Sequence, residues 1–390
     1  MSSGDVVPEH GVPTKQVGRD LAEARGIVRA WLAEHLHAGD DLDITELSMP
    51  AATGTSNESL LFAATWSEGG ETVTRRFVLR LDNPHSLYLE SPARLHYEVY
   101  EVLGEATSVP VPAVLAYEPD PSLLGVPFFL MERVEGRAPS DQPPFNVEGW
   151  VVELDAGERR TMWRNFVEVM APMHGLDVRL FPMLEGRSLA WEVDRWVRHA
   201  RWTHGDRDPH PVLSATADWL QEHLPQDAPA GFAWGDARLQ NVLFGDGGTV
   251  NAVVDLDMVS LAGGESDLAW FCVCNHYQGA LTGRPQLEGI GTGRETVELW
   301  EQLVGRAPRH WDYHLVLATY RLALVMARLA VLVAAAGMPE VAEKITAENA
   351  AIPYLAQQTG PPVGRAGRLR LGRGAAARRL TPGSPRRASR

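Results

Sequence analysis

Apolar and polar residues alternate along two segments near the amino terminus. Residues 59–66 and 72–81 follow this two-residue period, and the sequence Ser-Glu-Gly-Gly at residues 67–70 separates them. Alternation over this length is typical of half-buried strands, so the pattern predicts a hairpin. Residues 127–131 are a short apolar run that leads towards a turn at Gly136, and they predict a further strand.

Other segments have the spacing of a helix. Residues 91–104 begin with Ser-Pro and end with Leu-Gly, so we expect a helix with Ser91 as N-cap and Gly104 just past its end. Apolar residues also recur every three or four positions between residues 162 and 173. They predict a core-facing helix that ends near His174, which we interpret as a packing residue rather than a catalytic one.

The longest apolar stretch of the chain covers residues 315–336. Arg321 and Arg328 interrupt it, and their separation of seven residues would place both on one face of a helix. An arginine at the centre of a bilayer costs about 2.5 to 3.5 kcal/mol. We therefore expect a buried helix here and no membrane span.

Two further apolar runs flank the most informative polar residues. Residues 242–244 and 250–254 are separated by Asp-Gly-Gly, which predicts a second hairpin. Asp236 precedes this hairpin and Asp255 follows it, so the fold-back would bring the two carboxylates together. Asn241 comes five residues after Asp236. This is the spacing by which kinase-type enzymes build a catalytic base and a magnesium site.

The residue types suit phosphoryl transfer. Asp236 is the candidate base for an attacking hydroxyl, and the oxygens of Asn241 and Asp255 are ligands that magnesium prefers. Arg238 is the candidate for stabilising charge on the transferring phosphate. Ordinary turn chemistry is the alternative for either aspartate alone, but it explains the whole spacing poorly.

Residues 234–270 resemble the aminoglycoside phosphotransferase-like family, whose members carry a His-Gly-Asp loop, an Ile-Asp-Trp-Glu-like strand end and a Gly-Asp-Pro-x-x-Asp-Leu-Ala segment. Here Trp234 replaces the histidine, Leu256 and Asp257 replace Trp-Glu, and the last segment keeps Asp267 without the proline. This version is similar to the kinase domains found beside or fused to acyl-CoA dehydrogenases. The resemblance implies a structural role for Asp267 in holding the catalytic loop, and Asp257 as a further metal or supporting residue.

The fold implied by this resemblance is α+β and protein-kinase-like, with a small β-rich amino-terminal lobe and a larger, mostly helical carboxy-terminal lobe. The corresponding boundaries are a flexible amino terminus at 1–16, a nucleotide-binding lobe at 17–132, a catalytic and acceptor-binding lobe at 133–360 and a disordered Arg-rich tail at 361–390. That tail carries nine arginines and no acidic residue.

The resemblance also implies a nucleotide site in the amino-terminal lobe. It implies a phosphate loop at residues 52–57 and places Arg80 where kinases have a lysine, with Glu98 as its expected ion-pair partner. It also implies a hinge between the lobes near residue 132, whose backbone would bind adenine. An ordinary turn, a solvated arginine, a surface glutamate and an edge strand are the alternatives for these four features. The expected nucleotide-binding residues are Gly54, Thr55, Ser56, Asn57, Arg80, Glu98, Met131, Glu132 and Val134.

Charge and cysteine usage add little that is specific. Removing the nine positive charges of the tail from the net charge of −14 leaves −23 for residues 1–360. Such a field could attract a cationic acceptor, but it more simply confers solubility. Cys272 and Cys274 suit reduced thiols, and residues 1–14 lack the pattern of a signal peptide, so we expect a cytoplasmic location. No specific nucleic-acid partner is expected.

Together these features predict magnesium-dependent transfer of the γ-phosphate of ATP or GTP to a hydroxyl of a small molecule. A hydroxyacyl thioester, an aminoglycoside or another small alcohol would be the acceptor. A protein acceptor is disfavoured, because only eleven residues separate Asp255 from Asp267 and leave no room for a peptide-docking activation segment. The rival hypothesis is a nucleotide-binding pseudokinase that acts as a sensor or scaffold.

Overall fold

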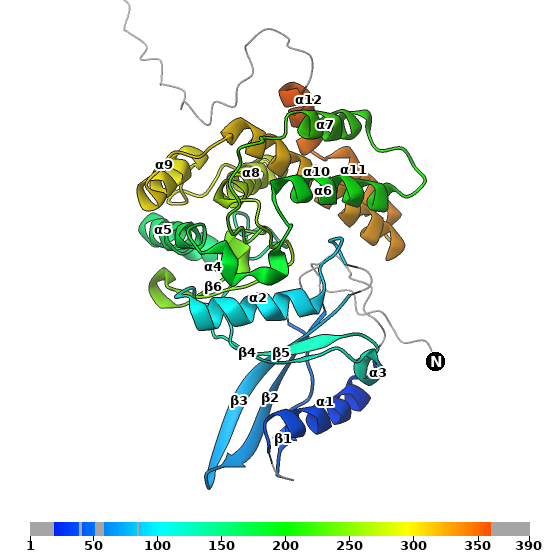
Figure 1. Ribbon diagram of the computed structural model, residues 1–390, viewed down its shortest axis with the longest axis vertical. Coiled ribbons are helices and arrows are strands. Elements are labelled where there is room, and N and C mark those ends of the chain that lie inside the picture. Colours follow the sequence, from blue (N-terminus) through cyan, green and yellow to red (C-terminus); the bar gives the residue numbers. More distant parts are fainter. Residues whose placement is uncertain (1–18, 39–40, 51–57, 84–85, 360–390) are drawn as a thin grey trace, which may run out of the picture.

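The computed structural model describes residues 19–38, 41–50, 58–83 and 86–359. An antiparallel sheet dominates the amino-terminal part, and the remainder of the described chain is mostly helical (Figure 1). This arrangement confirms the predicted α+β class with two lobes of unequal size. The segments expected at 1–16 and 361–390, and the loop at 52–57, lie outside the described residues.

The amino-terminal sheet is antiparallel, with the strand order β1-β2-β3-β5-β4. Its strands are β1 (Asp43–Ile44), β2 (Glu58–Glu68), β3 (Glu71–Leu81), β4 (Val114–Glu118) and β5 (Phe128–Glu132), with the short helix α3 (Pro121–Leu124) before β5. β2 and β3 form the predicted hairpin, and β5 is the strand expected near residue 130. Because alternate residues of β2 and β3 point to one face, they pack there against α1 (Leu21–His35).

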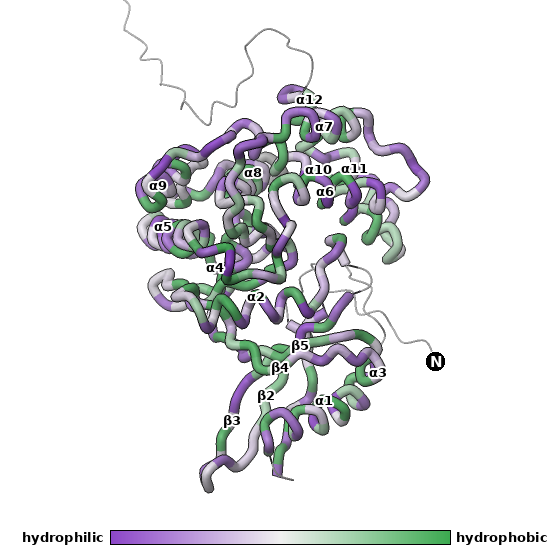
Figure 2. Tube along the Cα trace, in the orientation of Figure 1, coloured by the Kyte–Doolittle hydropathy of each residue, from purple (hydrophilic) through white to green (hydrophobic). Residues whose placement is uncertain are grey.

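The two ends of β3 differ in hydropathy (Figure 2). Its first residues, Glu-Thr-Val-Thr-Arg-Arg, are mostly exposed, whereas Phe77, Leu79 and Leu81 are fully buried. The neighbouring strand β5 is hydrophobic and buried over most of its length. The end of β3 is therefore fixed in the core, and Arg80 lies in this fixed part.

The predicted helix after the sheet is α2 (Ala93–Ala106), but its ends differ from the prediction. The N-cap is Pro92, and the N–H of Ala93 donates to Asp82 Oδ1 at 2.5 Å. Ser91 Oγ instead lies 2.9 Å from His96 Nε2. Since β3 leads directly to Asp82, a contact between elements replaces the local cap. Gly104 lies inside the helix rather than past its end.

The carboxy-terminal part is built from helices around two hydrophobic clusters. One cluster joins α2, the predicted hairpin at residues 242–254 and the Met-rich helix, which ends at Met173 with His174 as its C-cap. The other is formed mainly by residues between 189 and 220, between 258 and 277 and between 313 and 355. The helices are α4 (Trp150–Glu153), α5 (Ala156–Met173), α6 (Leu189–His204), α7 (Pro211–Glu222), α8 (Gly264–Thr282), α9 (Gly293–Val304), α10 (Trp311–Ala335), α11 (Pro339–Ala347) and α12 (Ala351–Thr359).

The longest helix, α10, contains the apolar stretch noted in the sequence. Among the described residues it is the one helix with the length and composition to cross a membrane, and 56% of its most apolar window is buried in the fold. It contacts α6, α8, α11 and α12. Arg321 is fully buried and Arg328 is partly buried, with its guanidinium 3.7 Å from the ring centre of Trp202. α10 thus serves as a core helix of the larger lobe.

The two lobes are joined where the chain leaves β5. Arg137 and Phe244 exchange backbone hydrogen bonds of 2.9 and 3.1 Å, which attach the connecting segment to the hairpin of β6 (Val242–Phe244) and β7 (Val250–Val253). Gly136 has a φ of +153°, and a Cβ there would lie 3.0 Å from the Leu243 Cβ. The predicted second hairpin is therefore present, and the segment that connects the lobes is paired with it.

Candidate active site

The loop that carries Asp236 depends on a glycine. Gly235 has a φ of +90°, and an added Cβ would lie only 2.0 Å from the carbonyl oxygen of Met258. The N–H groups of Trp234 and Gly235 each donate to one carboxylate oxygen of Asp267, at 2.7 Å in both cases. The expected role of Asp267 in holding this loop is thus confirmed.

His174 and Trp300 in turn hold the Asp267 carboxylate in place. Trp300 Nε1 donates to His174 Nδ1 at 2.8 Å, so the hydrogen of the imidazole must lie on Nε2. That Nε2 donates to Asp267 Oδ2 at 3.1 Å. His174 is therefore more than the packing residue that the sequence suggested, because its tautomer orients the carboxylate that holds the loop.

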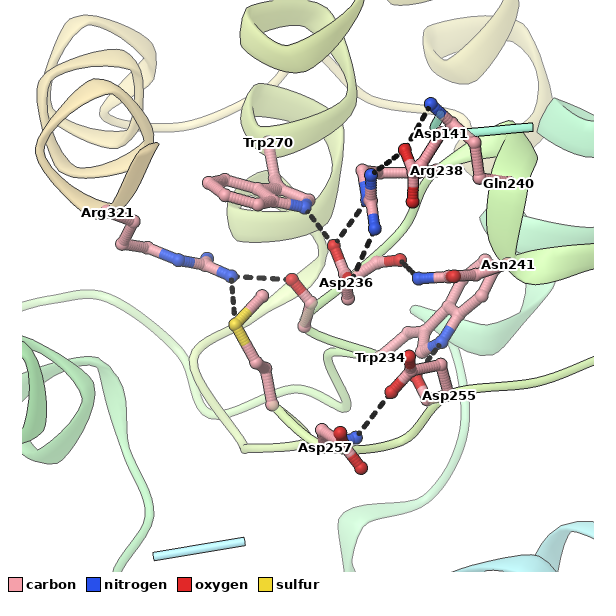
Figure 3. Close-up of polar contacts among 12 residues, drawn as sticks. Asp141, Trp234, Asp236, Arg238, Gln240, Asn241, Asp255, Asp257, Trp270 and Arg321 are labelled. Atoms are coloured by element: carbon pink, nitrogen blue, oxygen red, sulfur yellow. Dashed lines mark hydrogen bonds and ion pairs between the residues drawn. The ribbon is translucent and has the colours of Figure 1, made fainter. Parts of the chain in front are cut away.

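Asp236 is almost fully buried and its side chain is held on both oxygens (Figure 3). Trp270 Nε1 donates to Oδ1 at 2.7 Å, and Arg238 donates through Nε to Oδ1 at 2.8 Å and through Nη2 to Oδ2 at 3.2 Å. Arg238 also binds Asp141 at 2.9 Å. Burial would lower the pKa of Arg238, but Asp141 and Asp236 together raise it well above its usual value. The guanidinium is therefore charged beside the candidate base.

Trp234, which replaces the histidine of the family pattern, supports the turn at Asp255, the candidate metal ligand. Its indole Nε1 donates to the carbonyl oxygens of Val254 and Asp255 at 3.1 and 2.8 Å. Asp255 has a φ of +63°, an uncommon backbone conformation for a residue with a side chain. The Trp234 indole and the hydroxyl of Tyr100, which accepts from the Asp255 N–H at 3.1 Å, hold this turn.

Asn241 and Asp255 face the same region as Asp236 (Figure 3). Asn241 Nδ2 donates to the backbone oxygen of Asp236 at 2.9 Å, so the amide nitrogen is used by the loop. The pKa of Asp255 is raised well above its usual value by burial and by the nearby Asp257, with Asp236 adding to the effect. The negative charges of Asp257 and Asp236 thus disfavour ionisation of Asp255, and a cation bound at Asp255 would offset that effect.

The donor set fits magnesium. Asn241 and Asp255 offer oxygen ligands, and magnesium typically binds one or two protein oxygens together with water and phosphate. Within the described residues, no group of three or more His, Cys, Asp and Glu side chains could enclose a metal ion. The two oxygens of Asn241 and Asp255 are within the number of protein ligands that magnesium usually takes.

Arg80 does not form the ion pair predicted with Glu98. Its Nη2 lies 3.2 Å from Asp257 Oδ1, whereas Glu98 binds Arg94 one turn earlier on α2 at 2.8 Å. Glu98 is partly exposed and pairs with Arg94 on the same helix face, whereas Asp257 is fully buried beside Arg80. Burial would lower the pKa of Arg80, but Asp257 and Asp255 raise it. The prediction of a pair between Arg80 and Glu98 was therefore wrong.

His96 is the other side chain at Asp257. Its Nδ1 lies 3.3 Å from Asp257 Oδ1, and burial lowers the pKa of the imidazole to about 4. The ring is therefore neutral near pH 7, and this contact is not an ion pair there. Arg80 consequently supplies positive charge to Asp257 that His96 does not.

Two arginines that the sequence reasoning did not assign to the site support its loops. Arg321 of α10 donates to the Gly235 carbonyl at 2.5 Å and to Ser266 Oγ at 3.2 Å, and it lies over the ring of Trp270. Arg195 of α6 donates to the backbone oxygen of Asp257 at 3.2 Å. Arg321 could have been found from its position in an apolar stretch, since a fully buried arginine needs partners.

Some of the residues expected to bind adenine and phosphate lie within the described part of the chain and others do not. Gly54, Thr55, Ser56 and Asn57 lie outside the described residues. Met131 and Glu132 pair within the sheet, with the Glu132 N–H donating to the Ala113 carbonyl at 2.8 Å. The backbone of Val134 has no hydrogen-bond partner among the described residues. Of the three hinge residues, Val134 therefore offers its backbone to a ligand.

A small cavity lies beside Arg238, on the side of α8. Its empty space of about 180 Å³ includes solvent at its mouth, so the enclosed part is too small for a drug-sized ligand. Its lining is mostly apolar or amide-bearing and comprises Phe145, Arg238, Leu239, Gln240, Phe271, Cys274, Asn275 and Gln278. Arg238 thus lines this cavity as well as contacting Asp236.

Comparison with known sequences gives one family match and several relatives. Residues 54–311 match the model of the phosphotransferase enzyme family. The chain is 28% identical over 264 residues to the protein named Probable acyl-CoA dehydrogenase IBR3 of Arabidopsis thaliana, covering 64% of this chain and 30% of that protein. It is 24% identical over 338 residues to acyl-CoA dehydrogenase family member 11 of Homo sapiens, covering 82% and 39%. The chain thus spans less than half the length of these two relatives.

Solved structures share the fold. A Ralstonia eutropha protein assigned as an aminoglycoside phosphotransferase aligns with a TM-score of 0.62 and 22% identity, over 86% of this chain and 99% of that one. An ethanolamine kinase of Plasmodium vivax aligns with a TM-score of 0.52 and 10% identity, over 83% of both chains. These likenesses confirm the predicted protein-kinase-like fold.

Proposed function

The chain belongs to the phosphotransferase enzyme family, and from this premise we propose that it transfers the γ-phosphate of ATP or GTP to a hydroxyl of a small molecule with the help of magnesium. The observation that carries the proposal is the meeting of Asp236, Asn241 and Asp255 around one hairpin. All three are buried or partly buried, and dedicated hydrogen bonds hold the loops that carry them.

Asp236 is the proposed base. Its carboxylate is oriented by Trp270 and Arg238, and it would accept the proton of the acceptor hydroxyl as that oxygen attacks the γ-phosphorus. The bond from the γ-phosphorus to the bridging oxygen then breaks, and the nucleoside diphosphate leaves with that oxygen. Arg238 would meet the negative charge of the transferring group, because it is charged and lies beside the base.

Asn241 and Asp255 are the proposed metal ligands. Bound magnesium would neutralise charge on the nucleotide phosphates. The negative charges of Asp257 and Asp236, which raise the pKa of Asp255, support a cation beside it. On the nucleotide side, Arg80 would bind phosphate, the loop of residues 54–57 would contribute backbone N–H groups, and Val134 would bind adenine through its backbone.

A small acceptor is preferred over a peptide. After Asp255 only eight residues precede α8, and Ser260 in this stretch pairs with Ala233 of the catalytic loop. No long segment is therefore available there to dock a protein chain. The acyl-CoA dehydrogenase names of the relatives make a hydroxyacyl thioester a natural first acceptor to test, with aminoglycosides and ethanolamine-like alcohols beside it.

Calorimetry followed by an acceptor screen tests this proposal. ATP should bind the wild-type chain more tightly with magnesium than without it, and a double Asn241→Ala and Asp255→Ala variant should lose that difference. Production of ADP should depend on an acceptor and should be lost in Asp236→Ala while ATP binding persists. Tight metal-dependent binding without turnover on any acceptor would instead favour a nucleotide-binding sensor.

A further inference from the structure

Asp257 lies where three elements of the two lobes meet. Its carboxylate contacts Arg80 of β3 at 3.2 Å and His96 of α2 at 3.3 Å, and its backbone oxygen accepts from Arg195 of α6 at 3.2 Å. The side chain is fully buried, as is His96 to within 1%. Asp257 itself belongs to the segment after β7, two residues beyond Asp255. A carboxylate of the catalytic lobe thus reaches the strand and helix of the nucleotide-binding lobe.

Asp257 restricts where the guanidinium of Arg80 can lie. Its side chain is only 15% exposed, and Asp257 is the largest of the charges that stabilise its cationic form. A buried charge without a counter-charge is strongly unfavourable, so the position of Asp257 dictates where the guanidinium can lie. Glu98 cannot share this task in the observed arrangement, because it faces Arg94 on the more exposed side of α2.

We propose that Asp257 is the positioning residue for Arg80, and that it replaces the helix glutamate as the group that aims this arginine at the nucleotide phosphates. The inference rests on the proposed function, in which Arg80 meets phosphate. Arg195 contributes by fixing the backbone of Asp257. Because Arg80 and Asp257 come from different lobes, the pair also sets how β3 faces the catalytic hairpin.

A double-mutant cycle on nucleotide binding tests the proposal in the full chain. Dissociation constants for ATP with magnesium are measured for wild type, Asp257→Asn, Arg80→Gln and the double variant. We expect Asp257→Asn to weaken ATP binding by about tenfold, or about 1.4 kcal/mol. Adding Asp257→Asn to Arg80→Gln should cause no further loss, since the arginine through which Asp257 acts is already gone.

Two comparisons separate positioning from a general structural role. Adenosine, measured as a competitor of ATP, lacks phosphates, so its affinity should be the same in wild type and Asp257→Asn. A second cycle with Glu98→Gln removes the other carboxylate, and its effect should add to that of Arg80→Gln. The proposal would be overturned if the loss from Asp257→Asn added to that from Arg80→Gln while the loss from Glu98→Gln did not. It would also be overturned if Asp257→Asn weakened adenosine binding as much as ATP binding.

Folding and the underlying function have their own readouts. If Asp257→Asn does not fold, the double variant carries the test, because it removes both members of the pair and its ATP affinity must equal that of Arg80→Gln. Failure of the wild-type chain to bind ATP with magnesium would contradict the proposed function and this inference with it. Wild-type binding that Asp257→Asn leaves unchanged would contradict the inference alone.

Discussion

At the scale of single residues, Trp234 shows how a departure from a family pattern can preserve its geometry. The indole N–H holds the carbonyls of Val254 and Asp255, and it supports the positive φ at Asp255. The ring itself is buried and packs near Phe166. The residue therefore connects the loop of the base to the turn of the proposed metal ligand.

Trp234→Phe should separate the hydrogen bonds from the packing. The phenyl ring keeps most of the buried area, but two carbonyls lose their donor, so the free energy of unfolding should fall by about 1 to 3 kcal/mol. Turnover should fall roughly tenfold to a hundredfold, because Asp255 would lose one of the two side chains that hold its turn. Denaturant unfolding and steady-state kinetics measure the two effects.

Trp202→Phe is the matched control for this substitution. Trp202 lies on α6 under the guanidinium of Arg328, and no hydrogen bond from its indole nitrogen is recorded among the described residues. It should change turnover little. Equal losses in the two variants would show that the indole N–H of Trp234 has no special role.

Local spacing in the sequence identifies the candidate site residues, whereas most of their contacts could not be predicted from it. Asp236, Asn241 and Asp255 were found because their spacing around a hairpin is short and local. The contact of Arg80 with Asp257 spans 177 residues, and no local pattern encodes it. The same holds for Trp270, whose bond to Asp236 depends on how α8 packs.

At the scale of elements, α10 connects the hydrophobic core to the catalytic loop. Its Arg321 is fully buried and donates to the Gly235 carbonyl, and its guanidinium is 5.5 and 4.5 Å from the ring centres of Trp196 and Trp270. A mostly apolar helix thus places the guanidinium of Arg321 against the loop that carries Asp236. The shape of the loop that carries Asp236 therefore depends on the position of α10.

Arg321→Lys should damage activity although it conserves charge. Lysine lacks the planar fork that contacts the Gly235 carbonyl and Ser266 Oγ, so about 1 to 3 kcal/mol of unfolding free energy should be lost. The value of kcat should fall more than the affinity for ATP, because the loop of the base is affected directly. Arg328→Lys on the same helix is the control, since its guanidinium contacts Ser86 and Trp202 instead.

The elements themselves were largely predictable, and their ends were not. Alternation and turn sequences identified both hairpins, because these signals are local. The cap of α2 failed as a prediction since Asp82, at the end of β3, supplies the acceptor in place of Ser91. Element types thus followed from periodicity, whereas the caps and the partner of Glu98 followed from packing and neighbouring side chains.

At the scale of the whole molecule, three buried histidines should make the fold sensitive to acid. Burial lowers the pKa values of His96, His199 and His314 to about 4, from 6.5. Between these values the unfolded chain binds protons that the folded chain does not, so stability falls as the pH falls. Each histidine should contribute up to about 3 kcal/mol of lost stability at pH 4.

Thermal or denaturant unfolding between pH 7 and pH 4 checks this prediction. The wild-type chain should lose stability steeply below pH 6.5, and the His199→Gln variant should show a shallower slope because one titrating group is gone. Glutamine can still donate to the Leu87 carbonyl that contacts His199 Nε2. Identical slopes in the two proteins would mean that His199 does not titrate as its burial indicates.

The intrinsic fluorescence of Trp234 and Trp270 should report ligand binding at the site. One donates to the backbone of a proposed metal ligand and the other to the carboxylate of the proposed base. Indole emission responds to the charge and polarity around the ring, so binding of magnesium and ATP should change the intrinsic fluorescence without any added dye. Twelve tryptophans contribute to the total signal. A difference titration between wild type and Trp270→Phe would isolate the component that arises beside the base.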